Sequence, residues 1–152
     1  MIVEQLQNDL KEAMKSKDAV RMRTVRSLRS AIMAKEIDLR SGGTGSISDE
    51  DALAVIQKQA KQRRDSIEQF VAAGRDDLRQ VEEEELAVIE SYLPKQLSEA
   101  EVRKEVEAIA AQIGASGPAD MGKLMGQAMS RLKGKADGKL VQEAAKAILT
   151  GS

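Results

Sequence analysis

The segment 133–139, Lys-Gly-Lys-Ala-Asp-Gly-Lys, holds the residues best suited to chemistry, because it places three lysines and two glycines before a predicted helix. Free N–H groups and the positive end of a helix dipole favour a phosphate there, and glycines let the backbone approach it closely. The alternative is an ordinary turn between two helices with solvated lysines. The segment is not a nucleotide-binding P-loop, because it lacks that motif's spacing and its preceding strand.

A second group of basic residues spans two further predicted helices. If those helices pack side by side, their side chains form one surface suited to a phosphate backbone, with an affinity that falls steeply with salt. Alternatively these are solvated helix faces, with Lys61 paired to Asp65 and Arg64 paired to Glu68 one helical turn away. The residues of this secondary basic face are Arg21, Arg26, Arg29, Lys58, Lys61 and Arg64, with Arg23 and Arg63 beside them.

Two other patterns suggest structural roles. The run 82–85 consists of four glutamates, but consecutive helix positions point about 100° apart and cannot converge on one metal ion. We therefore expect a solvated acidic face. Gly122 and Gly126 lie four positions apart and mark a helix face that another backbone can approach. We expect close packing within the chain at that face, with a partner as the alternative.

The missing residue types narrow the chemistry further. The chain has no cysteine and no histidine, which removes disulfides, thiolate nucleophiles and imidazole bases. We therefore expect no catalytic residue, no cofactor and no metal. The aromatic residues are only Phe70, which we expect in the core, and Tyr92. An RNA partner is therefore expected to be recognised as a folded shape, through phosphates and sugars rather than stacked bases.

Helices are the elements that must position these groups. Apolar residues recur every three or four positions along the chain, and no segment alternates as a strand does. Pro94 ends the fourth helix, and residues 41–46 predict a flexible connector. We predict an all-α protein with a four-helix N-terminal lobe, 1–94, and a three-helix C-terminal lobe, 95–152. The predicted helices cover about residues 2–17, 19–39, 49–73, 77–93, 99–113, 118–133 and 138–149.

Several helix ends are marked by capping residues. Ser98 and Glu101 predict a capping box before the fifth helix, and Ser48 predicts a cap for the third. Gly74 is suited to a left-handed helix end, and Asp137 to the N-cap of the last helix.

The charge and the N-terminus bear on the compartment. A formal net charge of −1 argues against a general nucleic-acid coat and against a membrane-surface binder. No apolar run approaches the ~20 residues of a membrane span, and the first residues lack the order of a signal peptide. Together with the missing cysteines, these features predict a cytoplasmic protein with no membrane partner.

Short segments along the chain also carry a family signal through their order and spacing. They are 9–15 (Asp-Leu-Lys-Glu-Ala-Met-Lys), 24–28 (Thr-Val-Arg-Ser-Leu), 61–67 (Lys-Gln-Arg-Arg-Asp-Ser-Ile), 92–94 (Tyr-Leu-Pro) and 134–138 (Gly-Lys-Ala-Asp-Gly). Together they resemble the YqeY family, from Met1 to about Leu149. The resemblance implies four helices followed by three, and a relationship to the tail of the GatB subunit of the glutamine-dependent aspartyl/glutamyl-tRNA amidotransferase.

The same resemblance implies a function. The GatB tail resembles a tRNA-contacting appendage, and the family is associated with carbon-nitrogen ligase activity that uses glutamine as amido donor. The sequence holds no Ser-Ser-Lys amidase arrangement, so no self-sufficient catalytic site is expected. The matching residues 135 and 137–139 are implied as part of a tRNA-contact region.

We therefore expect a tRNA-associated binding module, accessory to amidotransfer, that contacts tRNA through its phosphate backbone. One alternative is a protein-interaction adaptor with no nucleic-acid partner, which docks an amidotransferase subunit or another protein. Another is an amidotransferase subunit that is active only in a complex. The candidate RNA-binding residues are Lys123, Lys133, Gly134, Lys135, Asp137, Gly138 and Lys139.

Overall fold

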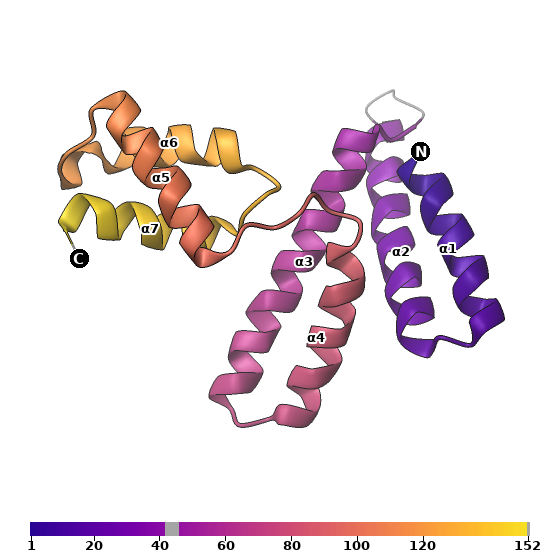
Figure 1. The fold of residues 1–152 in the computed structure, drawn as a ribbon. Coiled ribbons are helices and arrows are strands. Elements are labelled where there is room, and N and C mark those ends of the chain that lie inside the picture. The colour runs from indigo at the N-terminus through magenta and orange to yellow at the C-terminus, as the bar shows by residue number, and fades with distance from the viewer. Residues whose placement is uncertain (42–45, 152) are drawn as a thin grey trace. The chain divides into compact units, whose positions relative to one another are not determined.

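The computed structural model describes residues 1–41 and 46–151. Every regular element in these ranges is a helix, which confirms the all-α prediction (Figure 1). The chain divides into two compact units, Met1–Leu93 (unit 1) and Pro94–Ser152 (unit 2). Positions 42–45 of the predicted connector lie outside the described residues.

Unit 1 contains four helices whose ends are fixed by local chemistry. Lys17 adopts a left-handed conformation, with φ of 56°, and closes the first helix. The Asp18 carboxylate accepts the backbone N–H of Arg21 at 3.0 Å, which starts the second helix. Ser48 accepts the backbone N–H of Asp51 at 3.1 Å and caps the third, as its position predicted. The helices are α1 (Ile2–Ser16), α2 (Ala19–Ser41), α3 (Asp49–Ala72) and α4 (Asp76–Glu90).

The core of unit 1 is aliphatic. Each buried Leu or Ile contributes about 1.5–3 kcal/mol by leaving water. Phe70, expected in the core, is instead only half-buried, because it lies in the last turn of α3, away from the cluster. The buried apolar cluster consists of Leu6, Val25, Leu28, Ile32, Ala52, Ile56, Ala60 and Ile89.

A polar cluster joins α2, α3 and α4 and corrects the expectation of a solvated acidic face at Glu85, whereas Glu83 and Glu84 are exposed as expected. Glu85 is buried, and its two carboxylate oxygens accept from Arg23 Nε at 2.8 Å and Arg63 Nε at 2.9 Å. The reason is helical phase: Glu85 precedes the core residue Ile89 by one helical turn, so both point inward. Arg23 and Arg63, which were expected beside the secondary basic face, thus bind a carboxylate inside unit 1.

Unit 2 contains three α-helices and one short 3₁₀-helix. Ser98 and Glu101 form the predicted capping box at the start of α5. The predicted sixth helix begins one turn later than expected, because the residues after Gly117 form a 3₁₀-turn. The elements are α5 (Glu99–Ile113), η1 (Pro118–Asp120), α6 (Met121–Leu132) and α7 (Gly138–Thr150).

Unit 2 has a core of its own. Apolar residues from all three α-helices meet in it, so the unit does not depend on unit 1 for a buried interior. Its buried residues are Val102, Val106, Ile109, Ala110, Leu124, Ala128, Leu132, Val141, Ala144, Ala145 and Leu149.

Candidate nucleic-acid interface

The lysine turn, residues 133–139, begins where α6 ends. The Leu132 carbonyl accepts the backbone N–H of Lys135 at 2.9 Å and of Ala136 at 3.2 Å. This tight reversal requires a left-handed residue, and Gly134 supplies it with φ of 81°. The turn therefore has a defined backbone that glycine makes accessible.

Two residues that precede α5 hold the turn from one side. Gln96 donates from its side-chain amide to the Gly134 carbonyl at 2.8 Å, and the Leu97 N–H donates to the Lys135 carbonyl at 2.8 Å. These bonds fix the backbone between the lysines. Sequence reasoning missed both residues, because nothing local marks a contact with residues almost forty positions away.

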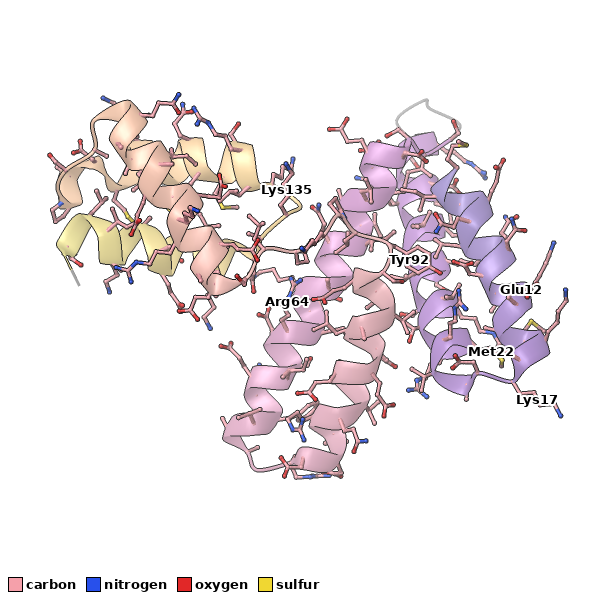
Figure 2. All side chains as sticks on the ribbon, viewed as in Figure 1. Glu12, Lys17, Met22, Arg64, Tyr92 and Lys135 are labelled. Carbon is pink, nitrogen blue, oxygen red and sulfur yellow. The ribbon has the colours of Figure 1, made fainter. Side chains whose placement is uncertain are left out.

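The lysine side chains of the turn are exposed to solvent. Lys133, Lys135 and Lys139 are all exposed, and Figure 2 shows Lys135 on the loop that joins α6 to α7. In the described ranges, neither Lys133 nor Lys135 forms an ion pair. The turn thus presents cationic groups on a backbone that hydrogen bonds hold in place.

Lys123 does not belong to this cluster. It lies in the first turn of α6, ten residues before Lys133, which corresponds to about 15 Å along the helix axis. Lys123 lies near Asp120, whose pKa is lowered mainly by hydrogen bonds from the Ser116 and Gly117 backbone, and to a lesser degree by the Lys123 charge. The structure therefore separates Lys123 from the turn lysines.

The N-terminus of α7 carries the protein's own carboxylate. Asp137 is the N-cap, and its side chain accepts the Lys139 N–H at 3.2 Å. The Asp137 carboxylate uses the Lys139 N–H and places a negative charge at the end of the helix where a phosphate is expected. The lysine side chains are therefore the groups of this turn that attract an anion.

Gly138 is shielded on one side by a methionine. A Cβ added at Gly138 would lie 3.4 Å from the Met129 terminal methyl carbon, while Met129 remains 37% exposed. Met129 therefore covers the backbone at the start of α7 and forms an apolar border beside the lysines.

The glycine face of α6 differs from the prediction of close packing within the chain. Gly122 and Gly126 are exposed, and a Cβ at either position would meet no atom within 4 Å. The apolar stripe of α6 points toward the core and leaves the glycine face outside, so spacing alone did not reveal which face was buried.

The secondary basic face is divided among different neighbours. Arg21 pairs with Asp9 at 3.4 Å and Arg64 with Glu90 at 3.1 Å. Lys61 pairs with Asp65 at 3.8 Å, as expected. Arg29 instead lines a groove beside α1, while Arg26 and Lys58 are exposed. These residues do not form a single open surface, because three of them bind carboxylates.

Two residues from the family segments meet in unit 1. The Tyr92 hydroxyl donates to the Asp9 carboxylate, which also pairs with Arg21. Burial first, and then this hydrogen bond, raises the pKa of Tyr92 above its ordinary value. The contact ties the residues that follow α4 to α1.

Neither a metal-binding cluster nor a membrane-spanning helix occurs in the part of the chain that the structure describes. No group of three or more metal-ligating side chains occurs among residues 1–41 and 46–151. Within the same ranges, no helix has the length and hydropathy needed to cross a bilayer.

Comparison with known proteins confirms the family resemblance. A family model described as Yqey-like protein matches residues 3–149. Altered inheritance of mitochondria protein 41 from Lachancea thermotolerans is 40% identical over 119 residues, which cover 76% of this chain and 62% of that protein. The protein of the same name from Pyrenophora tritici-repentis is 33% identical over 139 residues, or 90% of this chain and 74% of that protein.

The relatives are longer than this chain. The protein of the same name from Meyerozyma guilliermondii is 45% identical over 89 residues, with 58% of this chain and 44% of that protein covered. The chain thus spans less than two thirds of the length of the Lachancea and Meyerozyma proteins.

The relatives also correct the predicted localisation. Their names place them in mitochondria, which contradicts the expected cytoplasmic protein. The prediction was wrong because a lack of cysteine fits any reducing compartment and does not distinguish among them.

Proposed function

Because the chain belongs to the Yqey-like family, we propose that it is a helical binding module that contacts tRNA through the lysine turn of unit 2. The observation that carries this proposal is the fixed turn itself. Lys133 and Lys135 flank the backbone that Gln96 and Leu97 hold by hydrogen bonds, and Lys139 follows in the first turn of α7. Such preorganised cations suit phosphates, whose contacts supply most of the sequence-independent affinity for nucleic acid.

The aromatic residues favour recognition of shape over recognition of bases. Phe70 is half-buried in the last turn of α3, and the Tyr92 hydroxyl is bound to Asp9. Neither aromatic lies in unit 2, so the lysine turn offers no stacking platform for an unpaired base. A folded RNA with closely spaced phosphates is therefore the partner that fits.

The role in amidotransfer follows from the resemblance to the GatB tail. The chain has no histidine or cysteine and no Ser-Ser-Lys amidase arrangement. The proposed role is accordingly to present tRNA to amidotransferase subunits that carry the chemistry. Binding, rather than ammonia release or ATP-dependent activation, is the task of this chain.

The test compares two charge-reversal variants of the full chain. The turn variant combines Lys133→Glu, Lys135→Glu and Lys139→Glu. The control variant combines Lys95→Glu, Lys104→Glu and Lys146→Glu. Both variants carry the same net charge and alter exposed lysines of unit 2. Binding of unmodified tRNA is followed by fluorescence anisotropy at several salt concentrations.

We expect the turn variant to lose roughly tenfold or more in affinity and to show a shallower salt dependence, since each phosphate contact adds to that slope. The control should keep most of the affinity. Equal losses in both variants, or tRNA binding that survives reversal of the turn, would reject the lysine turn as the site.

A further inference from the structure

A groove runs between α1 and α2 of unit 1. It encloses a cavity of about 230 Å³, with Val3 and Leu6 on the α1 side and Ile32 and Met33 on the α2 side. Figure 1 shows the two helices side by side as an antiparallel hairpin. Leu6 and Ile32 belong to the buried core of unit 1. The apolar lining of the groove is therefore continuous with that core.

Exposed apolar side chains extend this groove along the hairpin. Met33 is 56% exposed and Met14 is 52% exposed. The cavity itself lies beside Val3 and Met33, whereas Met14 lies eleven residues from Val3 on the same face of α1, about 16 Å or three helical turns away. On soluble proteins, a patch of exposed apolar side chains often marks a site where another molecule binds.

The α2 side of the groove combines methionines with arginines. A second face of α2 lies beside the buried one, because four residues recur at intervals of four, three and four positions. They are Met22, Arg26, Arg29 and Met33. Figure 2 shows Met22 near the turn of the hairpin. Methionine adapts its shape to many apolar partners.

The charge of this face is mainly positive. Arg26 is exposed and Arg29 half-buried, and neither forms an ion pair with another described residue. Glu36 is the acidic residue that lines the cavity. Arg29 lines the groove and Arg26 lies one turn further along the same face of α2. This apolar surface with two arginines beside it is complementary to a helix with apolar residues on one face and carboxylates beside them.

We propose that the α1–α2 groove binds an acidic amphipathic helix of a partner protein. Three turns of that helix place apolar residues at i, i+4, i+7 and i+11, about 16 Å in all, against Val3 and Met33 at one end and Met14 at the other. Its carboxylates pair with Arg26 and Arg29, whose guanidinium groups donate two parallel hydrogen bonds to a carboxylate. This site lies in unit 1 and does not depend on the lysine turn.

The experiment places a photoreactive benzoylphenylalanine at Met33 in the full chain, expressed in its native cells. A matched control carries the same group at Val71, a similarly exposed apolar residue at the end of α3. Crosslinked peptides are sequenced after proteolysis, with and without ribonuclease treatment. The readout is the segment that is bound, not only the identity of the captured protein.

The expected result is a ribonuclease-resistant crosslink from position 33, but not from position 71, to a segment that forms an acidic amphipathic helix. Arg29→Glu should reduce its yield severalfold, and reversal of the facing acid to Arg in the partner should restore it. The proposal is overturned by crosslinks to RNA or to a second copy of this chain, by crosslinks to segments without that pattern, by equal labelling from both positions, or by no crosslink.

Discussion

At the scale of single residues, three carboxylates organise much of the molecule. Glu85 joins α2 and α3 to α4 by binding Arg23 and Arg63. Asp9 binds Tyr92 and Arg21. Asp137 caps α7 within the lysine turn. Each carboxylate satisfies donors that would otherwise lose hydrogen bonds on folding, so these acids have structural roles.

The bond between Tyr92 and Asp9 predicts a stability that depends on pH. Burial of the hydroxyl, and then the hydrogen bond that it donates only while protonated, raise the pKa of Tyr92 in the folded protein above its ordinary value of 10.0. A raised pKa means that the contribution is fully present below about pH 10 and is lost as the pH rises further. We expect Tyr92→Phe to lower the free energy of unfolding by about 1–2 kcal/mol near pH 7.

The measurement is urea unfolding of both proteins, followed by far-ultraviolet circular dichroism from about pH 7 to pH 11. Subtracting the two curves removes the titration of lysines that both proteins share. The difference should be constant at neutral pH and shrink above about pH 10. A difference that does not change with pH would contradict a hydrogen bond from the Tyr92 hydroxyl to a carboxylate.

At the scale of elements, α6 has two unlike faces. Leu124 and Ala128 are fully buried in the core of unit 2, while Gly122 and Gly126 face solvent. Glycine inside an exposed helix weakens it, because the unfolded chain has more conformations to lose. The sequence therefore keeps a destabilising residue type at two positions where the described structure has room for a side chain.

This arrangement predicts that Gly122→Ala and Gly126→Ala each stabilise unit 2, by about 0.5–1 kcal/mol. Thermal unfolding of the full chain measures the effect. Gly134→Ala is the matched control and should destabilise, since its φ of 81° strains any residue with a Cβ. If Gly122→Ala destabilised instead, another segment would have to occupy that face in solution.

At the scale of the whole molecule, two cores predict two cooperative units. Unit 1 and unit 2 each bury their own set of aliphatic side chains. A change inside one core should therefore lower the stability of that unit and leave the other unchanged.

Glu85→Ala tests this expectation, because it leaves Arg23 and Arg63 without their buried partner. Arg23 is half-exposed and Arg63 keeps Glu82 at 3.6 Å, so we expect the loss of these hydrogen bonds to cost about 1–3 kcal/mol. Hydrogen exchange read by mass spectrometry should show faster exchange in α2, α3 and α4, with α5, α6 and α7 unaffected. Equal loss of protection in both units would show that they unfold as one.

The sequence by itself determined the helices of the described residues. Apolar spacing and capping residues act within a few positions, so Ser48, the Ser98–Glu101 box and Asp137 were placed correctly from local pattern alone. The turn lysines were likewise recognised as exposed cations at a helix boundary.

Only the tertiary structure decided which helix face meets which neighbour. Glu85 points inward, Gly122 points outward, and Gln96 binds the Gly134 carbonyl. All three features depend on contacts between residues far apart in the chain. The spacing of a helix specifies which residues share a face. The burial of that face is set by packing free energy, which depends on every element that surrounds it.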